Sequence, residues 1–207
     1  MIEERTARAR LLDAALETAA IHGLAKLSVG DVARRAGLSR QTLYKHFPSR
    51  DALVAETILR EARRMTDQIV AAANAETDPE RSLEVAILAT LRMARDHPLL
   101  DRLVRTEPEA LLPFLVADGG VVGTAVRATV EAIVDEKVPG LPPVTLRRVA
   151  DMVSRLLISY AVNAPDDPPE VVAGVVSQMM TGGLSRMLGG ELPASLQSPR
   201  PGALGTR

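Results

Sequence analysis

The sequence of 207 residues contains no cysteine and no tryptophan, and its four aromatic residues are two phenylalanines and two tyrosines. Without cysteine, the chain has neither disulfide bonds nor a thiolate metal site. The three histidines, His22, His46 and His97, lie in separate segments, and none has a partner at the spacing of a metal site or a catalytic triad. No glycine-rich loop follows a strand, so a phosphate-binding motif is also absent. The sequence therefore predicts neither an enzyme nor a cofactor.

Long hydrophobic runs are missing as well. No stretch approaches the roughly 20 apolar residues of a membrane span, and the first ten residues, MIEERTARAR, lack the apolar core of a signal peptide. We therefore expect a cytoplasmic protein with no membrane partner. Patterns typical of β-strands are scarce, whereas alanine, leucine, arginine and glutamate dominate a chain that is 46% hydrophobic. This composition predicts an all-α globular fold.

The net charge of −1 conceals an asymmetry along the chain. Residues 1–50 hold nine Lys and Arg against five Asp and Glu, a net of +4, and residues 51–207 hold 16 against 21, a net of −5. A positive end on a negative remainder is expected when one end of a protein approaches a polyanion such as DNA. Arg5, Arg8 and Arg10 precede the first apolar stripe, where they either reach into a minor groove or stay solvated.

Residues 27–53 show a helix-turn-helix pattern. Ser28 and Ser39 are suitable N-caps for two successive helices. Gly37 stands where the first of these helices needs a residue in the left-handed conformation to close its last turn. Pro48 ends the second helix, and Ser49 caps a third. The pattern predicts two helices joined by a tight turn, followed by the start of a long helix.

The second of these helices, residues 40–47, carries outward side chains suited to DNA. Leu43 and Phe47 point inward, and the predicted DNA contacts are Arg40, Gln41, Thr42, Tyr44, Lys45, His46 and Arg50. Arg40 and Gln41 occupy the first turn, which helix-turn-helix proteins present to base edges, and such side chains can pair with guanine and adenine. Thr42 can meet a thymine methyl, and the other four can reach phosphates. A solvated polar face is the alternative, but two caps and a glycine turn beside this pattern favour DNA.

The same residues carry a resemblance to a known family. Residues 10–23 (RLLDAALETAAIHG), followed by VARRAGLS, TLYKHF and SRDAL within residues 27–53, resemble the N-terminal domain of the TetR family of bacterial transcriptional repressors. The resemblance covers about a quarter of the chain. It implies an all-helical homodimer with a DNA-binding head and a ligand-sensing body, with residues 40–46 on the recognition helix and Arg50 at a phosphate. Two residues depart from the pattern: Ala19 stands where the family often has phenylalanine, and Gly30 stands where some members have a base-contacting side chain.

We therefore expect three regions. Residues 1–50 form a three-helix DNA-binding head, residues 51–188 form a helical ligand-binding and dimerisation body, and residues 189–207 form a disordered tail. A long fourth helix over residues 50–75 joins head and body, and at 1.5 Å per residue it spans roughly 35–40 Å. Proline and glycine clusters divide the body so that the chain holds about nine helices, one of them over residues 108–117.

Two helices near the end of the chain carry regular apolar stripes. In residues 143–163 the apolar side chains recur at spacings of three and four, as in a coiled coil, and a second stripe follows in residues 169–188. The stripes alone fit an intramolecular core and a four-helix dimer interface equally well. The resemblance favours the interface, because the last two long helices usually dimerise in that family. The predicted interface residues are Leu146, Val149, Val153, Leu156, Val172, Val176 and Met179.

The body is rich in Leu, Val, Ala and Met, and Phe114 and Tyr160 are its only aromatic residues. A cavity with such walls suits a small hydrophobic ligand. Phe114, Met152 and Tyr160 are the predicted lining residues, although each also fits a plain core. Arg92, Arg102 and Arg105 are alternatives for a charged ligand group, but solvated or paired arginines explain them equally simply.

The expected function is a homodimeric repressor that binds a near-palindromic DNA operator and is released by a small, hydrophobic effector. The alternative is a helical binding or scaffold protein with non-specific DNA affinity and no effector, which Gly30 and Ala19 would fit. Salt-dependent DNA binding without any preferred sequence distinguishes this alternative from the repressor.

Overall fold

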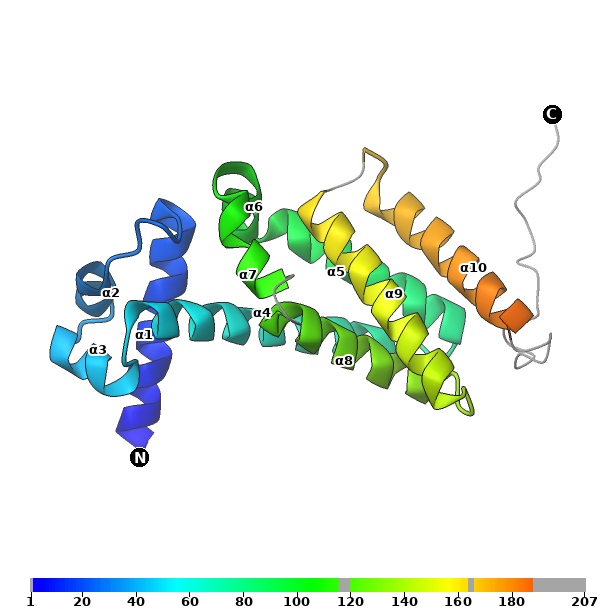
Figure 1. Cartoon of the computed structure of the whole chain (residues 1–207), viewed down its shortest axis with the longest axis horizontal. Coiled ribbons are helices and arrows are strands. Elements are labelled where there is room, and N and C mark those ends of the chain that lie inside the picture. Colours follow the sequence, from blue (N-terminus) through cyan, green and yellow to red (C-terminus); the bar gives the residue numbers. More distant parts are fainter. Residues whose placement is uncertain (1, 116–119, 164–165, 188–207) are drawn as a thin grey trace.

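The computed structural model describes residues 2–115, 120–163 and 166–187, and within these ranges it is all-α (Figure 1). The elements are α1 (Ile2–His22), α2 (Val29–Arg35), α3 (Arg40–His46), α4 (Arg50–Asn74), α5 (Pro79–Asp96), α6 (Pro98–Thr106), the 3₁₀ helix η1 (Pro108–Ala110), α7 (Leu112–Leu115), α8 (Val121–Lys137), α9 (Pro143–Val162) and α10 (Pro169–Met187). The all-α class is confirmed. Residues 108–115 form a 3₁₀ turn and a one-turn helix instead of one longer helix. The predicted tail lies outside the described residues.

Helices α1 to α3 form the head, and their ends are set by local hydrogen bonds. Ser28 Oγ accepts the Asp31 N–H at 3.4 Å, Ser39 Oγ accepts the Thr42 N–H at 3.0 Å, and Ser49 Oγ accepts the Ala52 N–H at 3.1 Å. Gly37 has a φ of 64° in the turn between α2 and α3. Each cap and the glycine turn predicted from the sequence are therefore confirmed.

The first helix begins at Ile2, so Arg8 and Arg10 are part of α1. Arg8 forms an ion pair with Glu56 of α4 and lies 5.2 Å from the centre of the Phe47 ring. Arg10 donates to the carbonyl of Ala36 at the end of α2. These two arginines hold the head helices together and do not extend as an arm. The side chain of Arg5 is outside the described part of the chain.

The head does not have a core of its own. Leu43 and Phe47 of α3 are fully buried in an apolar cluster with α1 and α2, and the body contributes Leu99, Leu103 and Leu111 to the same cluster. These body residues belong to α6 and the turn before α7, and α6 packs against α1. The head is therefore joined to the body through α6 as well as through α4.

Helix α4 ends at Asn74, one residue short of the predicted end, and runs from the head far into the body (Figure 1). In the body α4 packs against α5 and α8, α8 and α5 pack against α9, and α10 packs against α5. A second apolar cluster fills the space between α5, α8, α9 and α10. None of the described helices is both long and apolar enough to cross a membrane.

Candidate DNA-binding surface and ligand cavity

The outer face of α3 presents polar side chains that are not used inside the chain. Arg40, Gln41 and Lys45 are exposed, and the described residues offer none of them a hydrogen bond or ion pair. Tyr44 is 52% exposed beside them. A surface helix with free cationic, amide and phenol groups can donate hydrogen bonds to base edges and phosphates without first breaking an internal contact.

The other predicted α3 contacts are partly engaged. Thr42 Oγ1 lies 2.9 Å from Ser39 Oγ at the N-terminal cap. The ring of His46 is half-buried, with its centre 6.4 Å from that of Phe47. Both side chains lie on the same helix as the free groups, but their polar atoms have less freedom to reach DNA.

Gly30 of α2 lies directly against the guanidinium of Arg40. A Cβ added at Gly30 would collide with that guanidinium, which therefore rests over the space that glycine leaves open. The departure from the family pattern at Gly30 is thus tied to Arg40. Because Gly30 of α2 has no side chain, the guanidinium of Arg40 from α3 occupies the space beside it.

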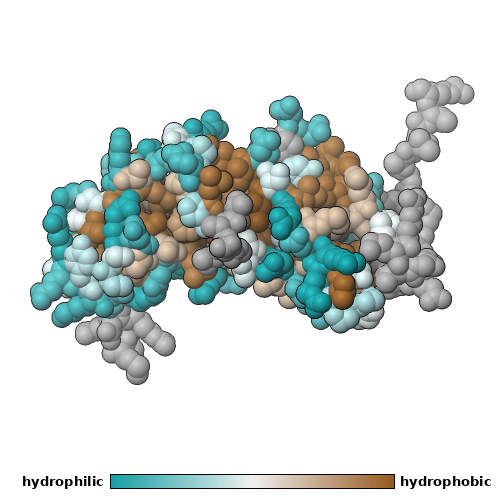
Figure 2. Space-filling view, in the orientation of Figure 1, coloured by the Kyte–Doolittle hydropathy of each residue, from teal (hydrophilic) through white to brown (hydrophobic). Residues whose placement is uncertain are grey.

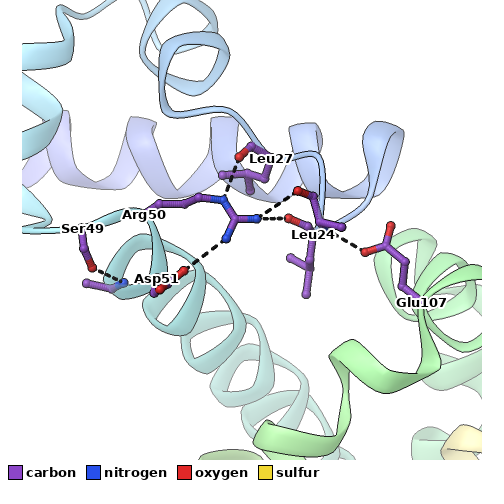
Figure 3. A network of polar contacts seen from close by, with 8 residues as sticks. Leu24, Leu27, Ser49, Arg50, Asp51 and Glu107 are labelled. Atoms are coloured by element: carbon purple, nitrogen blue, oxygen red, sulfur yellow. Dashed lines mark hydrogen bonds and ion pairs between the residues drawn. The ribbon is translucent and has the colours of Figure 1, made fainter.

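Arg50 at the start of α4 fastens the loop between α1 and α2 (Figure 3). Its Nε donates to the carbonyl of Leu27 at 3.0 Å, its guanidinium also reaches the carbonyl of Leu24, and it pairs with Asp51 at 3.1 Å. A phosphate at Arg50 would share the guanidinium with these partners.

Glu107 at the end of α6 reaches the same loop from the body (Figure 3). Its Oε2 accepts the N–H of Ala25 at 2.9 Å. The carboxylate lies against Gly23, whose φ of 84° suits glycine and whose missing side chain makes room for it. Sequence reasoning missed Glu107, because no local pattern connects it with a residue 82 positions away.

A cavity of about 180 Å³ lies among α4, α5, α6, α8 and α9. The described part of its wall is mainly aliphatic, and Phe114 contributes a phenyl ring. An apolar cavity of roughly 150 Å³ is sufficient to bind benzene. The cavity therefore has the size and chemistry to accept a small hydrophobic molecule.

Two ionisable side chains of the described residues also line this wall and contact each other. Glu61 of α4 and His97 at the N-cap of α6 both line the cavity, and Glu61 Oε1 lies 3.0 Å from His97 Nε2. The hydrogen bond from His97 holds the pKa of Glu61 below its ordinary 4.5, although burial acts in the opposite direction. His97 is the C-cap of α5 and the N-cap of α6, and its ring also lines the cavity. Within the described residues, no group of three or more His, Asp or Glu side chains is placed to hold a metal ion.

Residues 11–57 match the family model for bacterial regulatory proteins of the tetR family, and residues 78–181 match the model for the bacterial tetracyclin repressor C-terminal domain. The chain belongs to the TetR family. Its members are transcriptional regulators and not enzymes, and they bind DNA and act as dimers with small-molecule effectors. This TetR-family protein is accordingly a DNA-binding transcriptional regulator.

The chain is similar in sequence to other bacterial regulators over most of their lengths. An HTH-type transcriptional regulator of Mycobacterium tuberculosis strain H37Rv is 31% identical over 150 residues, which are 72% of each chain. The regulator AlkX of the same strain is 28% identical over 180 residues, 84% of this chain and 83% of its own. Among solved structures, the TetR family repressor AlkX from Dietzia sp. has a TM-score of 0.69 at 24% identity, and covers 86% of this chain and 97% of its own.

The structure of this TetR-family regulator places one of the three predicted lining residues in the cavity wall and two elsewhere. Phe114 lines the cavity, as expected. Met152 is 58% exposed on the outer face of α9, because the neighbouring Val153 takes the inward position. Tyr160 lines a separate hollow with Arg95 and Asp101. Two of the arginines considered for a ligand are paired elsewhere: Arg92 lies 2.6 Å from Glu170, and Arg105 lies 2.5 Å from Asp101.

Most of the predicted dimer residues also serve the chain's own core. Leu146, Val149, Val153, Val172 and Val176 are buried within the chain's own apolar cluster, and the half-buried Leu156 packs against it. Their 3-4 spacing describes the face of α9 that meets α5 and α8 and the face of α10 that meets α5. Met179, by contrast, is 72% exposed.

Exposed apolar side chains gather on the opposite faces of α9 and α10. We call this set the α9–α10 patch: Val144, Met152, Val171, Val175 and Met179. Each is about half exposed or more, and in the view of Figure 2 hydrophobic surface appears around α9 and α10 while the head is mainly hydrophilic. Exposed apolar side chains that gather in this way are typical of an interaction site.

Proposed function

We propose that this regulator is a cytoplasmic homodimeric repressor that binds a near-palindromic operator and leaves it when a small hydrophobic molecule enters the cavity. The observation that carries the proposal is the course of α4. Its first turn holds the α1–α2 loop through Arg50, and its middle lines the cavity with Ile58, Met65 and Ile69. A ligand that displaces α4 therefore acts on the helix that begins in the DNA-binding head.

For DNA, we infer that α3 enters the major groove. Arg40 and Gln41 are free to meet base edges, and Tyr44 and Lys45 are free to meet phosphates. Thr42, His46 and Arg50 are secondary candidates, because each also serves an internal contact. In a two-fold symmetric dimer, the two copies of α3 would occupy successive major grooves roughly 34–36 Å apart.

For the effector, the aliphatic wall with Phe114 supports a hydrophobic molecule. The Dietzia repressor with the same fold is implicated in the biodegradation of n-alkanes, a wholly apolar class of compound. Release requires only that the effector bind one dimer state better than the other.

A second connection supports release through α6. Leu99 and Leu103 of α6 line the cavity and also belong to the apolar cluster of the head. At the end of the same helix, Glu107 accepts a hydrogen bond from the loop before α2. Movement of α6 around a ligand would therefore change the support of α2 and, through it, of α3.

For the second subunit, the α9–α10 patch supports pairing with its own copy, because isologous dimers use one self-complementary surface twice. Met179 lies near the end of α10 and is the most exposed member of the patch.

The proposal is tested by selecting operators from random double-stranded DNA with the purified full chain. We expect one enriched sequence with two-fold symmetry, protected symmetrically in a footprint. Enrichment of no sequence, with binding that depends on salt alone, would indicate a helical protein with non-specific DNA affinity.

Glu107→Ala tests the connection through α6. The lost hydrogen bond contributes about 1 kcal/mol, so amide exchange at Ala25 should become roughly fivefold faster in the free protein. Release by an effector should weaken in the same variant. The control is Glu109→Ala, because Glu109 is exposed two residues further along the chain. Unchanged exchange at Ala25 would show that the contact does not hold the loop in solution.

A further inference from the structure

Glu61 and His97 form a buried polar pair in the mainly aliphatic wall of the cavity. Glu61 is 9% exposed, and the His97 side chain is 15% exposed. Three threonines also line the wall. Thr90 and Thr129 donate to carbonyls of their own helices at 2.8 and 2.9 Å, so their hydroxyls are already satisfied, and the half-buried Thr66 adds one neutral hydroxyl. Burying a carboxylate costs free energy unless hydrogen bonds compensate. The pair is therefore the main polar feature that a ligand in this cavity would meet.

Hydrogen bonds fix the protonation and direction of the pair. The N–H of Leu100 donates to His97 Nδ1 at 3.2 Å, so the ring proton resides on Nε2. Nε2 then donates to Glu61 Oε1 at 3.0 Å. In this arrangement the imidazole is neutral and holds the carboxylate in one orientation. The lowered pKa of Glu61 keeps that carboxylate ionised at neutral pH.

The carboxylate retains capacity to accept another hydrogen bond. Among the described residues, Glu61 makes a hydrogen bond with His97 Nε2 at 3.0 Å and an ion pair with Arg64 at 3.9 Å, and both involve Oε1. A carboxylate has about four lone-pair sites on its two oxygens. Oε2 can therefore accept a hydrogen bond from a molecule inside the cavity.

We propose that the effector is an aliphatic alcohol, whose hydroxyl donates to Glu61 Oε2 while its chain occupies the aliphatic part of the cavity. This inference rests on the proposed function, since it names the chemical class of the effector. His97 is a positioning residue, because it holds the carboxylate without being needed as a ligand contact itself.

Other head groups fit less well. An alkane gives Glu61 no hydrogen bond. A fatty acid brings a second carboxylate next to an ionised one, which is unfavourable for both. An alkylammonium ion must shed its water in an apolar cavity, and Glu61 already accepts from His97 and lies 3.9 Å from Arg64. A hydroxyl supplies the donor without adding a charge.

Calorimetric titration of the wild-type full chain with octane, octanol, octanoate and octylamine tests the proposal, since the four share one chain length and differ in the head group. A hydrogen bond to a charged acceptor predicts that octanol binds at least about tenfold more tightly than octane. Octanoate and octylamine should also bind more weakly than octanol. If octane, octanoate or octylamine equals or exceeds octanol, or if none of the four binds, the proposal is overturned.

Glu61→Gln supplies a second, opposite signature. The amide oxygen can accept the His97 proton, which turns the amide N–H groups toward the cavity and replaces an acceptor with donors. Octanol exchanges a hydrogen bond to a charged acceptor for one from a neutral amide, which its oxygen can accept, so it should lose up to about tenfold in affinity, whereas octanoate should gain about tenfold. Glu109→Gln is the matched control outside the cavity and should leave the series unchanged. If Glu61→Gln fails to fold, the wild-type series alone decides.

Operator binding by the ligand-free protein is measured in parallel. Sequence-specific operator binding without a preference for octanol refutes this inference and leaves the proposed function standing. Absence of any sequence-specific binding refutes the proposed function, while the calorimetric series still reports which head group the cavity prefers.

Discussion

Arg40→Ala should flatten base preference at one position of each operator half-site and lower the affinity for the selected operator. A bidentate arginine–guanine contact is worth about 1–3 kcal/mol of discrimination, and a symmetric dimer makes it twice. Lys45→Ala should instead weaken all sequences evenly and reduce the slope of log affinity against log salt by about one unit per half-site. Fluorescence anisotropy with the operator and its single-base variants, over a series of salt concentrations, separates the two effects.

Gly30→Ala is the informative companion to Arg40→Ala. The added Cβ would displace the guanidinium of Arg40 without removing its charge. If the direction of Arg40 matters for readout, Gly30→Ala should lower specificity while the salt slope stays unchanged. Base preference that survives Arg40→Ala intact would remove Arg40 from direct readout and leave Gln41 as the remaining candidate on the first turn of α3.

The head was predictable because local rules determine most of it. Ser28, Ser39 and Ser49 each cap the helix that follows them within three residues, and Gly37 adopts the backbone conformation that only a glycine adopts cheaply. Such signals involve neighbouring residues and survive whatever the rest of the chain does. The outward face of α3 followed directly, because the buried Leu43 and Phe47 fix the phase of the helix.

The body was less predictable because periodicity reports that a helix face is buried without saying what covers it. The regular stripe of α9, with Leu146, Val149 and Val153, faces α5 and α8 of the same chain. Except for Val144, each exposed apolar side chain of the α9–α10 patch precedes a buried one in the sequence, as Met152 precedes Val153. The spacing of apolar residues therefore did not distinguish the exposed side chains from the buried ones. Choosing between a subunit interface and a core therefore required the three-dimensional arrangement.

The polar contacts between distant segments were beyond the sequence altogether. Glu61 and His97 are 36 residues apart, and Ala25 and Glu107 are 82 residues apart. Neither pair has a local signature, because each forms only when α6 packs against α4 and α1. Both pairs involve an end of α6, which therefore contacts both the cavity and the head.

Met179→Glu should convert the dimer into a monomer. Glutamate favours helices about as well as methionine, so α10 should persist. In an isologous interface, however, the change buries a new charge from each subunit. An uncompensated buried charge costs about 3–5 kcal/mol, which predicts a dimer at least about 100-fold weaker. Sedimentation analysis over a concentration series measures the change.

The control for Met179→Glu is Leu112→Glu, since Leu112 is 56% exposed on α7 and lies outside the α9–α10 patch. The control should remain dimeric and retain operator affinity. Met179→Glu should bind a single half-site as tightly as wild type but lose the gain that the second half-site provides, because α3 itself is untouched. A variant that stays dimeric at wild-type strength would place the subunit contact on another surface, and the exposed apolar side chains of α9 and α10 would then need a different partner.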